Sequence, residues 1–249
     1  FLDWGTEIVW DSDINPEGVY EQLEFSLGQA LNAEWGLETQ MGQFIVEESG
    51  SGNDLELFAY GIGLNRKGDA GDATKVRFAY YDWQDYVDLI KSGSILGAGG
   101  TDPETDELKV ITLYGEHSHE MVWPIIGSKK TVWFGNWAHN LEEGSQVSKP
   151  GNDNAYAAGV KIGKAKKQGE WDTRYQYFYV ESNALPSAFV DQDIAYGGTN
   201  NTGHMLEYAY MLRDYLKFST TLYVGERIED VGGDDLEMLR WQFNLIYGF

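Results

Sequence analysis

The sequence contains no cysteine. Disulfides and thiolate metal sites are therefore excluded, and the absence fits an exported protein that avoids periplasmic thiol chemistry. The sequence also lacks any apolar run near the roughly 18 to 20 residues that a membrane-spanning helix requires, and its mean hydropathy is -0.42. A membrane signal, if there is one, must be carried by alternation along strands. No signal peptide is visible at residues 1–4, so export requires a leader that was removed or that lies outside this sequence.

Basic residues are scarce. The chain has 18 Lys and Arg residues against 40 Asp and Glu residues, a formal net charge of -22. This balance argues against a nucleic-acid partner, which needs a basic footprint, and against a peripheral enzyme steered to anionic lipid. We interpret the excess acid as solubilising loops that face water, since much of it lies at 102–107, 142–143 and 234–235.

Aromatic residues and glycines are abundant, and the C-terminal segment shows how they are used. From Glu237 to Phe249 the residues alternate between an apolar face and a polar face, the period of an extended strand. The apolar face is Leu239, Trp241, Phe243, Leu245, Tyr247 and Phe249, and the other face holds Arg240, Gln242, Asn244 and Gly248. An exposed hydrophobic edge strand is a liability in a soluble domain, whereas a closed membrane barrel pairs both edges and turns the apolar face to lipid. We therefore interpret Trp241, Phe243, Tyr247 and Phe249 as an assembly signal, because bacterial outer-membrane barrels end in a similar aromatic strand that the barrel-assembly machinery reads.

Strand-like runs separated by turn residues fill the chain, and no linker divides it. We predict twelve strands, at about 6–12, 19–28, 33–47, 54–66, 74–88, 106–126, 130–140, 154–166, 170–183, 203–213, 216–228 and 237–249. They are longer than the five or six residues typical of globular strands, and all but 6–12 reach the 9 to 11 that a membrane strand needs. Their connections alternate between mostly short and mostly long, as in outer-membrane barrels, although 65–74 is longer than that pattern predicts.

The fold that we predict is all-β, a closed antiparallel transmembrane β-barrel of about 12 strands that forms a single domain over residues 1–249. The strand Glu237–Phe249 is expected to pair with the first strand around Thr6–Asp11, because an open edge in hydrocarbon leaves backbone groups unsatisfied. Alternation alone does not exclude a soluble β-sandwich, which buries its apolar face instead.

Several stretches resemble the putative porin family of bacterial outer-membrane barrels. The most specific are EWDTRYQYFYVESNALPSAFVDQD at 170–193 and GGTNNTGH at 197–204, supported by DINPEG at 13–18 and FGNWAHN at 134–140. The resemblance covers most of the chain from about residue 6 onward. It implies a passive diffusion channel in the cell outer membrane. Members of that family are often longer, so further strands are expected if the natural chain begins before Phe1.

The leading functional hypothesis is an outer-membrane porin through which small hydrophilic solutes diffuse passively, and not an enzyme. One alternative is a non-conducting barrel that anchors or organises the envelope, its lumen closed by the loops at 89–105 and 184–202. Another is a soluble, β-rich carbohydrate-binding protein that uses exposed Tyr and Trp. The expected partners are outer-membrane lipid, lipopolysaccharide, the barrel-assembly machinery and the solutes, with no nucleic acid; a homotrimer is a further option.

Charged residues on the inward face would set the selectivity of such a channel. The acidic set is Glu7, Asp11, Glu24, Glu34 and Glu38, with Gln22 and Gln40 beside it, and the basic set is Lys75, Arg77, Lys161, Arg174, Lys217, Arg227 and Arg240. The acids fall on the first three strands and the bases on later ones, which predicts opposite walls of unlike charge and a transverse field. The alternative is that these charges pair across the lumen and plug a narrow barrel.

Other chemistry has weaker support in the sequence. His117 and His119 share a strand face and could chelate a metal, although such residues are more often water-facing, and we expect no metal site there. No nucleophile-elbow or phosphate-loop pattern occurs in the sequence, and we expect no cofactor. The acidic segments 191–193 and 230–235 could bind Ca²⁺ weakly at the external surface.

Overall fold

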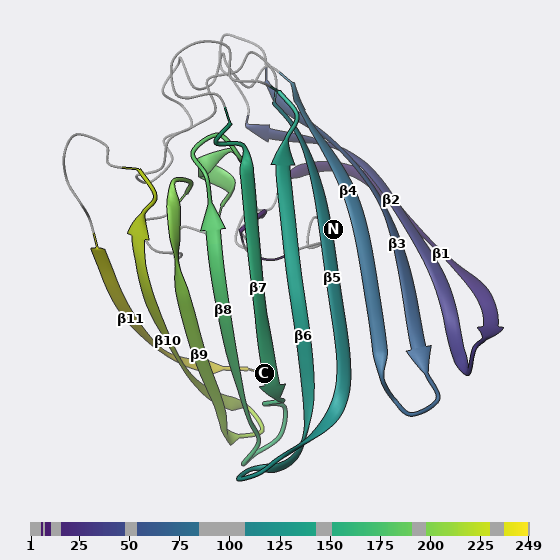
Figure 1. Cartoon of the computed structure of the whole chain (residues 1–249), viewed down its shortest axis with the longest axis vertical. Coiled ribbons are helices and arrows are strands. Elements are labelled where there is room, and N and C mark those ends of the chain that lie inside the picture. The colour runs from purple at the N-terminus through teal and green to yellow at the C-terminus, as the bar shows by residue number, and fades with distance from the viewer. Residues whose placement is uncertain are drawn as a thin grey trace.

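The computed structural model describes residues 6, 8–10, 16–47, 54–84, 108–142, 151–190, 198–229 and 237–248. Within these residues the chain forms one antiparallel sheet of eleven strands, each paired with its neighbours in sequence (Figure 1). The strands are β1 (Glu17–Ala30), β2 (Ala33–Glu47), β3 (Leu55–Gly68), β4 (Ala73–Gln84), β5 (Leu108–Trp123), β6 (Gly127–Asn140), β7 (Asn154–Gly163), β8 (Trp171–Val180), β9 (Asn201–Arg213), β10 (Leu216–Arg227) and β11 (Glu237–Tyr247). A short 3-10 turn, η1, covers Ser187–Phe189. No helix in the described part of the chain is long and apolar enough to cross a membrane.

The prediction of an all-β antiparallel fold is confirmed. Eleven of the twelve expected strands are present, and they are 10 to 16 residues long. Short turns join the strands at one end of the sheet, at 31–32, 69–72, 124–126, 164–170 and 214–215. The connections at the other end are longer, so the expected asymmetry is also present.

The connection expected at 65–74 is shorter than predicted, because β3 and β4 continue to Gly68 and from Ala73. Arg66 forms an ion pair with Asp72, and the Gly68 N–H donates to the Asp72 carbonyl at 2.8 Å. Gly71 has a φ of 83°, a left-handed conformation that glycine adopts without strain. A run of polar residues thus forms a tight hairpin.

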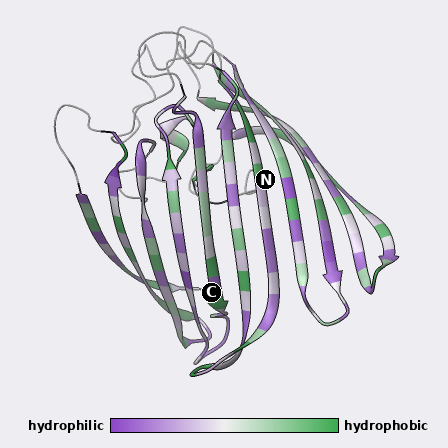
Figure 2. Ribbon diagram, viewed as in Figure 1, coloured by the Kyte–Doolittle hydropathy of each residue, from purple (hydrophilic) through white to green (hydrophobic). Residues whose placement is uncertain are grey.

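The sheet has two chemically different faces, because side chains alternate across each strand. Green and purple bands accordingly alternate along the strands (Figure 2). The convex face is apolar, and its exposed large side chains include Leu23, Phe25, Ile62, Leu64, Val76, Phe78, Leu113, Trp133, Leu206, Val224, Leu239, Trp241, Phe243 and Leu245. A water-soluble domain would bury such a face.

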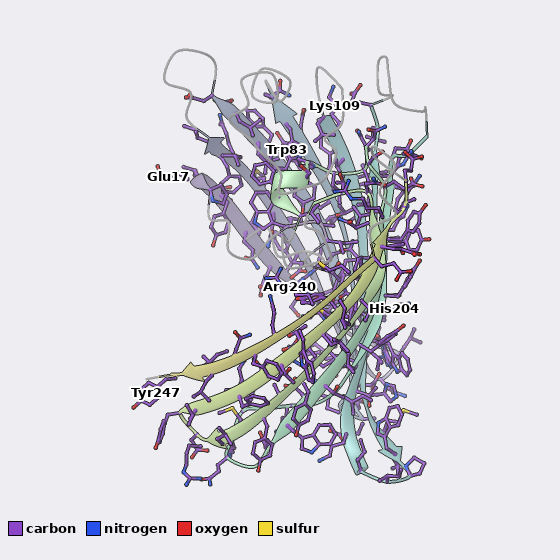
Figure 3. The ribbon with its side chains drawn as sticks, turned by 90° about the vertical axis from the view of Figure 1, so that its left-hand side faces the viewer. Glu17, Trp83, Lys109, His204, Arg240 and Tyr247 are labelled. Atoms are coloured by element: carbon purple, nitrogen blue, oxygen red, sulfur yellow. The ribbon has the colours of Figure 1, made fainter. Side chains whose placement is uncertain are left out.

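The predicted pairing of Glu237–Phe249 with Thr6–Asp11 is wrong. Among the described residues, β11 pairs only with β10 and β1 only with β2, so within this part of the chain both strands are free edges of a curved, open sheet (Figure 3). Thr6 and residues 8–10 form a turn, in which the Val9 N–H donates to the Thr6 carbonyl. The physical reason is that Ile8, Val9 and Trp10 are consecutive and all buried, whereas a membrane strand would turn every second residue the other way.

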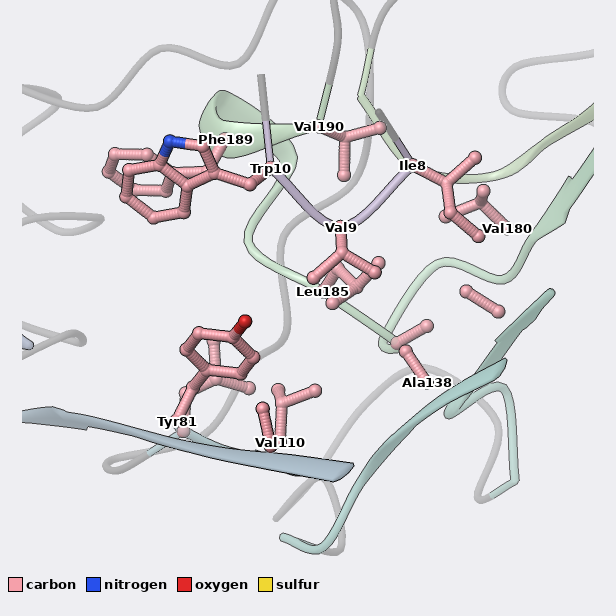
Figure 4. Packing of buried hydrophobic residues seen from close by; sticks show 14 of the residues in the cluster. Ile8, Val9, Trp10, Tyr81, Val110, Ala138, Val180, Leu185, Phe189 and Val190 are labelled. Carbon is pink, nitrogen blue, oxygen red and sulfur yellow. The ribbon is translucent and has the colours of Figure 1, made fainter. Parts of the chain in front are cut away.

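This N-terminal turn lies on the concave side, where it packs with the segment around η1 (Figure 4). Trp10 stacks on Phe189 with ring centroids 5.4 Å apart, and Phe189 contacts Trp83 of β4 at 4.7 Å. Tyr81, Val110, Ala138 and Val180 complete the apolar cluster from the inner wall. We call residues 6, 8–10 and 182–190 the inner plug.

Candidate lumen wall

The polar face predicted to line a pore is the concave face of the sheet. One row of residues crosses β2, β3 and β4 in register: Glu38, Gly63 and Arg77. Arg77 Nε donates to Glu38 Oε1 at 2.5 Å, so the ion pair spans the intervening strand. Gly63 makes this contact possible, because a Cβ there would lie 2.6 Å from Glu38 Oε1. Glu38 is only 4% exposed, and its charge is thus compensated inside the wall.

A second ion pair lies next to the first. Lys75 Nζ of β4 lies 3.2 Å from Glu116 Oε1 of β5, and the Tyr114 hydroxyl donates to Glu116 Oε2 at 2.7 Å. The Tyr114 and Glu116 side chains point to the same face of the sheet, because the two residues are two apart on one strand. The Lys75 charge is therefore balanced by a carboxylate on the neighbouring strand.

The strands β7 and β8 repeat this arrangement. Lys161 Nζ lies 3.4 Å from Asp172 Oδ1. Arg174 stacks over the Phe134 ring at 5.0 Å and donates from Nη2 to Gln176 Oε1 at 2.6 Å. Gly159 leaves room for this layer, because a Cβ there would lie 2.5 Å from the Phe134 ring. Glycine on the inner wall thus admits larger polar and aromatic neighbours.

A polar cavity of 540 Å³ lies beside the first four strands. Its lining includes Glu24, Glu34, Glu38, Lys75 and Arg77. These are five of the twelve predicted pore-lining residues, and the structure brings them around one space. Glu24 lies opposite Glu38 in the β1–β2 register, so this end of the wall keeps an acidic character.

The other predicted lining residues are more dispersed. Lys161 and Arg174 lie on β7 and β8 as described, and Lys217 and Arg227 lie on β10 with Arg240 on β11. Arg240 points into the concave side (Figure 3). Glu7 and Asp11 lie outside the described residues, as do Phe249 and the segments 89–105, 191–193 and 230–235.

Sequence reasoning missed two acids of this wall, Glu116 and Asp172. Asp172 lies two residues before Arg174 on one strand, so the two side chains share the inner face. Glu116 lies opposite Lys75 in the β4–β5 register, so it faces the same way as Lys75. The two-residue spacing from Arg174 could have identified Asp172 from the sequence, whereas Glu116 is identified only by the pairing of β4 with β5. These two acids give Lys75 and Lys161 a carboxylate partner on a nearby strand, as Glu38 does for Arg77.

The inner plug is fixed to this wall by a hydrogen bond between distant parts of the chain. The Thr6 N–H donates to Asn136 Oδ1 at 2.7 Å, and the Thr6 hydroxyl lies 3.2 Å from the same oxygen. Asn136 is buried on β6. The wall is therefore apolar and filled near the long connections, and polar and ion-paired nearer the short turns.

The remaining predicted features lie on the convex face. His117 and His119 do share a face, with ring centroids 5.2 Å apart, and no third potential ligand joins them in the part of the chain that the structure describes. Trp241, Phe243 and Tyr247 of the predicted assembly signal are exposed there. The indole N–H of Trp241 donates to Thr220 Oγ1 at 2.7 Å.

Comparison with known proteins supports the resemblance read from the sequence. Residues 129–246, which run from β6 to β11, match the model of the putative porin family. The predicted similarity to that family is thus confirmed over this part of the chain. A search of curated proteins finds no match to the chain.

Proposed function

We propose that this chain forms a closed barrel in a bacterial outer membrane and lets small hydrophilic solutes diffuse through its lumen. The observation that carries the proposal is the division of one long-stranded sheet into an apolar convex face and an ion-paired polar concave face. The match to the putative porin family supports the same assignment. Lipid would contact the convex face and water the concave one.

Closure of the sheet is part of this proposal. In the part of the chain that the structure describes, β1 and β11 each have one unpaired side, and unpaired backbone groups in hydrocarbon cost several kcal/mol each. Both strands run from the end with long connections to the end with short turns, so direct pairing between them would be parallel. An antiparallel closure needs an odd number of further strands between these edges.

The wall chemistry favours polar solutes without strong charge selection. Three basic residues of the wall are balanced by nearby carboxylates, so each contributes a local dipole more than a net charge. The acidic residues Glu24 and Glu34 lie on β1 and β2, at the opposite edge of the sheet from Arg227 and Arg240 on β10 and β11. A weaker transverse field than the sequence predicts follows from this arrangement.

A second candidate, a non-conducting envelope barrel, is favoured by the inner plug. Ile8, Leu185 and Val190 are at most 2% exposed on the concave side, so the plug occupies space that a wide pore would leave to water. The difference between the two candidates is whether water and solute pass beside the plug.

Planar-bilayer recording of the full chain separates these candidates. A porin gives stepwise conductance, and liposomes that contain it swell in small sugars with rates that fall as solute size increases. A membrane-inserted, heat-modifiable protein without conductance would establish the envelope barrel instead. A protein that stays soluble without detergent would contradict both.

A further inference from the structure

We infer that the short-turn rim beside β6, β7 and β8 binds the phosphate headgroup of an anionic phospholipid. This inference rests on the proposed membrane function and adds a lipid site to it. The rim holds a basic cluster that we call the lysine rim: Lys129, Lys130, Lys164, Lys166 and Lys167. In a chain with only 18 basic residues and a net charge of -22, this is an unusual concentration of positive charge.

The long connections at the opposite end have the contrary charge. They span 48–54, 85–107, 141–153, 181–200 and 228–236, and Lys91 and Lys149 are their only basic residues. The turn 164–170 alone has three lysines. The two ends of the sheet are therefore suited to different surroundings.

The geometry places part of the lysine rim on the lipid side of the wall. Lys129 lies four residues before Trp133 on β6 and therefore on the same face, and Trp133 is exposed on the convex face. The Lys129 Nζ lies 5.3 Å from the Trp171 ring centroid. Trp171 in turn stacks on Tyr208. A cation beside outward aromatic rings at a strand end is the arrangement found at membrane interfaces. A solute inside the lumen would not reach Lys129.

A cavity of 300 Å³ joins Lys129 to Lys164, and Ser128 and Trp171 also line it. Two carboxylates, those of Glu120 and Glu170, share this cavity. Glu120 accepts a hydrogen bond from the Ser128 hydroxyl at 3.1 Å and lies opposite Lys130 in the β5–β6 register. Glu170 accepts hydrogen bonds from the backbone of its own turn.

The backbone N–H groups of Lys166 and Lys167 donate to Glu170 Oε2 at 3.1 and 3.0 Å. These hydrogen bonds hold the pKa of Glu170 below its usual value. Lys164 Nζ lies 3.8 Å from Glu170 Oε1, a long contact at an exposed side chain. The turn is thus fixed by Glu170, while lysine side chains around it are exposed.

A phospholipid of the periplasmic leaflet is the occupant that fits. Short turns of outer-membrane barrels face the periplasm, and a headgroup phosphate there lies beside the outer wall at the level of the aromatic rings. Each lysine near such a surface contributes to anionic lipid binding. The glycerol and acyl chains would lie along the apolar convex face next to Trp171.

Native mass spectrometry of the detergent-solubilised full chain tests this site with phosphatidylglycerol and with phosphatidylcholine of the same acyl chains. The test variant is Lys129→Gln with Lys164→Gln. The matched control is Lys91→Gln with Lys149→Gln, which removes the same charge from the long connections. We expect wild type and control to bind phosphatidylglycerol more tightly than phosphatidylcholine, and the test variant to lose about tenfold in phosphatidylglycerol affinity only.

Equal affinity of wild type for the two lipids would overturn the inference, as would an unchanged preference in the test variant. Loss of binding to peptidoglycan sacculi in that variant, without a lipid preference in wild type, would assign the lysine rim to the cell wall and also overturn it. Heat-modifiability and conductance of the same samples separate the two proposals. A conducting barrel without lipid preference contradicts the lipid site alone, whereas a chain that gives no folded barrel contradicts both.

Discussion

Gly63 shows how one residue governs the candidate lumen wall, because it lies beneath the Glu38–Arg77 ion pair. Gly63→Ala would place a methyl group 2.6 Å from Glu38 Oε1 and 3.1 Å from Arg77 Cγ. We expect the pair to separate, with a loss of about 1 to 3 kcal/mol in the free energy of unfolding, as for other overpacked sites. Denaturant unfolding in micelles measures it.

Gly36→Ala is the matched control for that substitution. Gly36 is on the adjacent strand, and a Cβ there would meet only the Phe25 carbonyl at 3.5 Å and Asn65 Cβ at 4.0 Å. Its unfolding midpoint should stay close to that of wild type. Equal destabilisation by the two substitutions would show that the ion pair is not the cause.

The basic residues of the wall are expected to affect ion selectivity. Arg77→Ala with Arg174→Ala removes the partner of Glu38 and the cation over Phe134. The acidic residues are then uncompensated in a narrow, low-dielectric channel, which should raise cation preference, and the effect should diminish at 1 M salt, where the Debye length is about 3 Å. Reversal potentials in a salt gradient measure the change, and Glu38→Gln added to the pair should partly restore wild-type selectivity. An unchanged reversal potential would show that these residues do not line the conducting path.

The inner plug is the part of the fold that differs most from the sequence-based prediction. Phe189→Ala should remove a ring that packs between Trp10 and Trp83, at a cost of about 3 to 5 kcal/mol in unfolding free energy. If the plug narrows the pore, the same substitution should raise single-channel conductance. Tyr60→Ala, on the convex face, is the control and should leave conductance unchanged. Conductance of Phe189→Ala at the wild-type level would mean that the plug does not limit flow.

Substitutions in the strand β11 are expected to affect assembly of the barrel. Its apolar face, with Trp241, Phe243 and Leu245 more than 60% exposed, carries the assembly signal that the sequence predicts. Tyr247→Ser with Phe249→Ser should therefore leave aggregated protein in the periplasm and not a folded barrel. Fractionation and heat-modifiability of the expressed variant measure this. Folded variant protein in the outer membrane in the wild-type amount would contradict it.

The strands were predictable because each has a period of two that is long enough to be recognised without tertiary information. The segment 6–12 was not, since Ile8, Val9 and Trp10 break that period and their burial depends on the distant residues Leu185 and Phe189. The site was predictable in part for the same reason. Alternation along β4 predicts that Lys75 and Arg77 lie on the inner face. Their pairing with Glu116 and Glu38 depends on strand register, which the sequence of one chain does not specify.

In the whole molecule, each face of the sheet would meet a different solvent. The convex face would meet lipid along its full width, and the concave face would meet water beside the inner plug. The two ends differ as well, with acidic long connections and the lysine rim on the short turns. In the proposed barrel the short turns would face the periplasm, as they do in outer-membrane barrels.

Nitroxide scanning of β11 tests the central assignment most directly, and the absence of native cysteine makes single-cysteine labelling clean. The full chain, refolded in lipid vesicles, would be labelled singly at each position from 240 to 245. We predict a period of two, with positions 241, 243 and 245 most accessible to oxygen, which partitions into lipid, and positions 240, 242 and 244 most accessible to a water-soluble nickel chelate. Accessibility without that period, or equal exposure of both sets to the nickel chelate, would contradict the account.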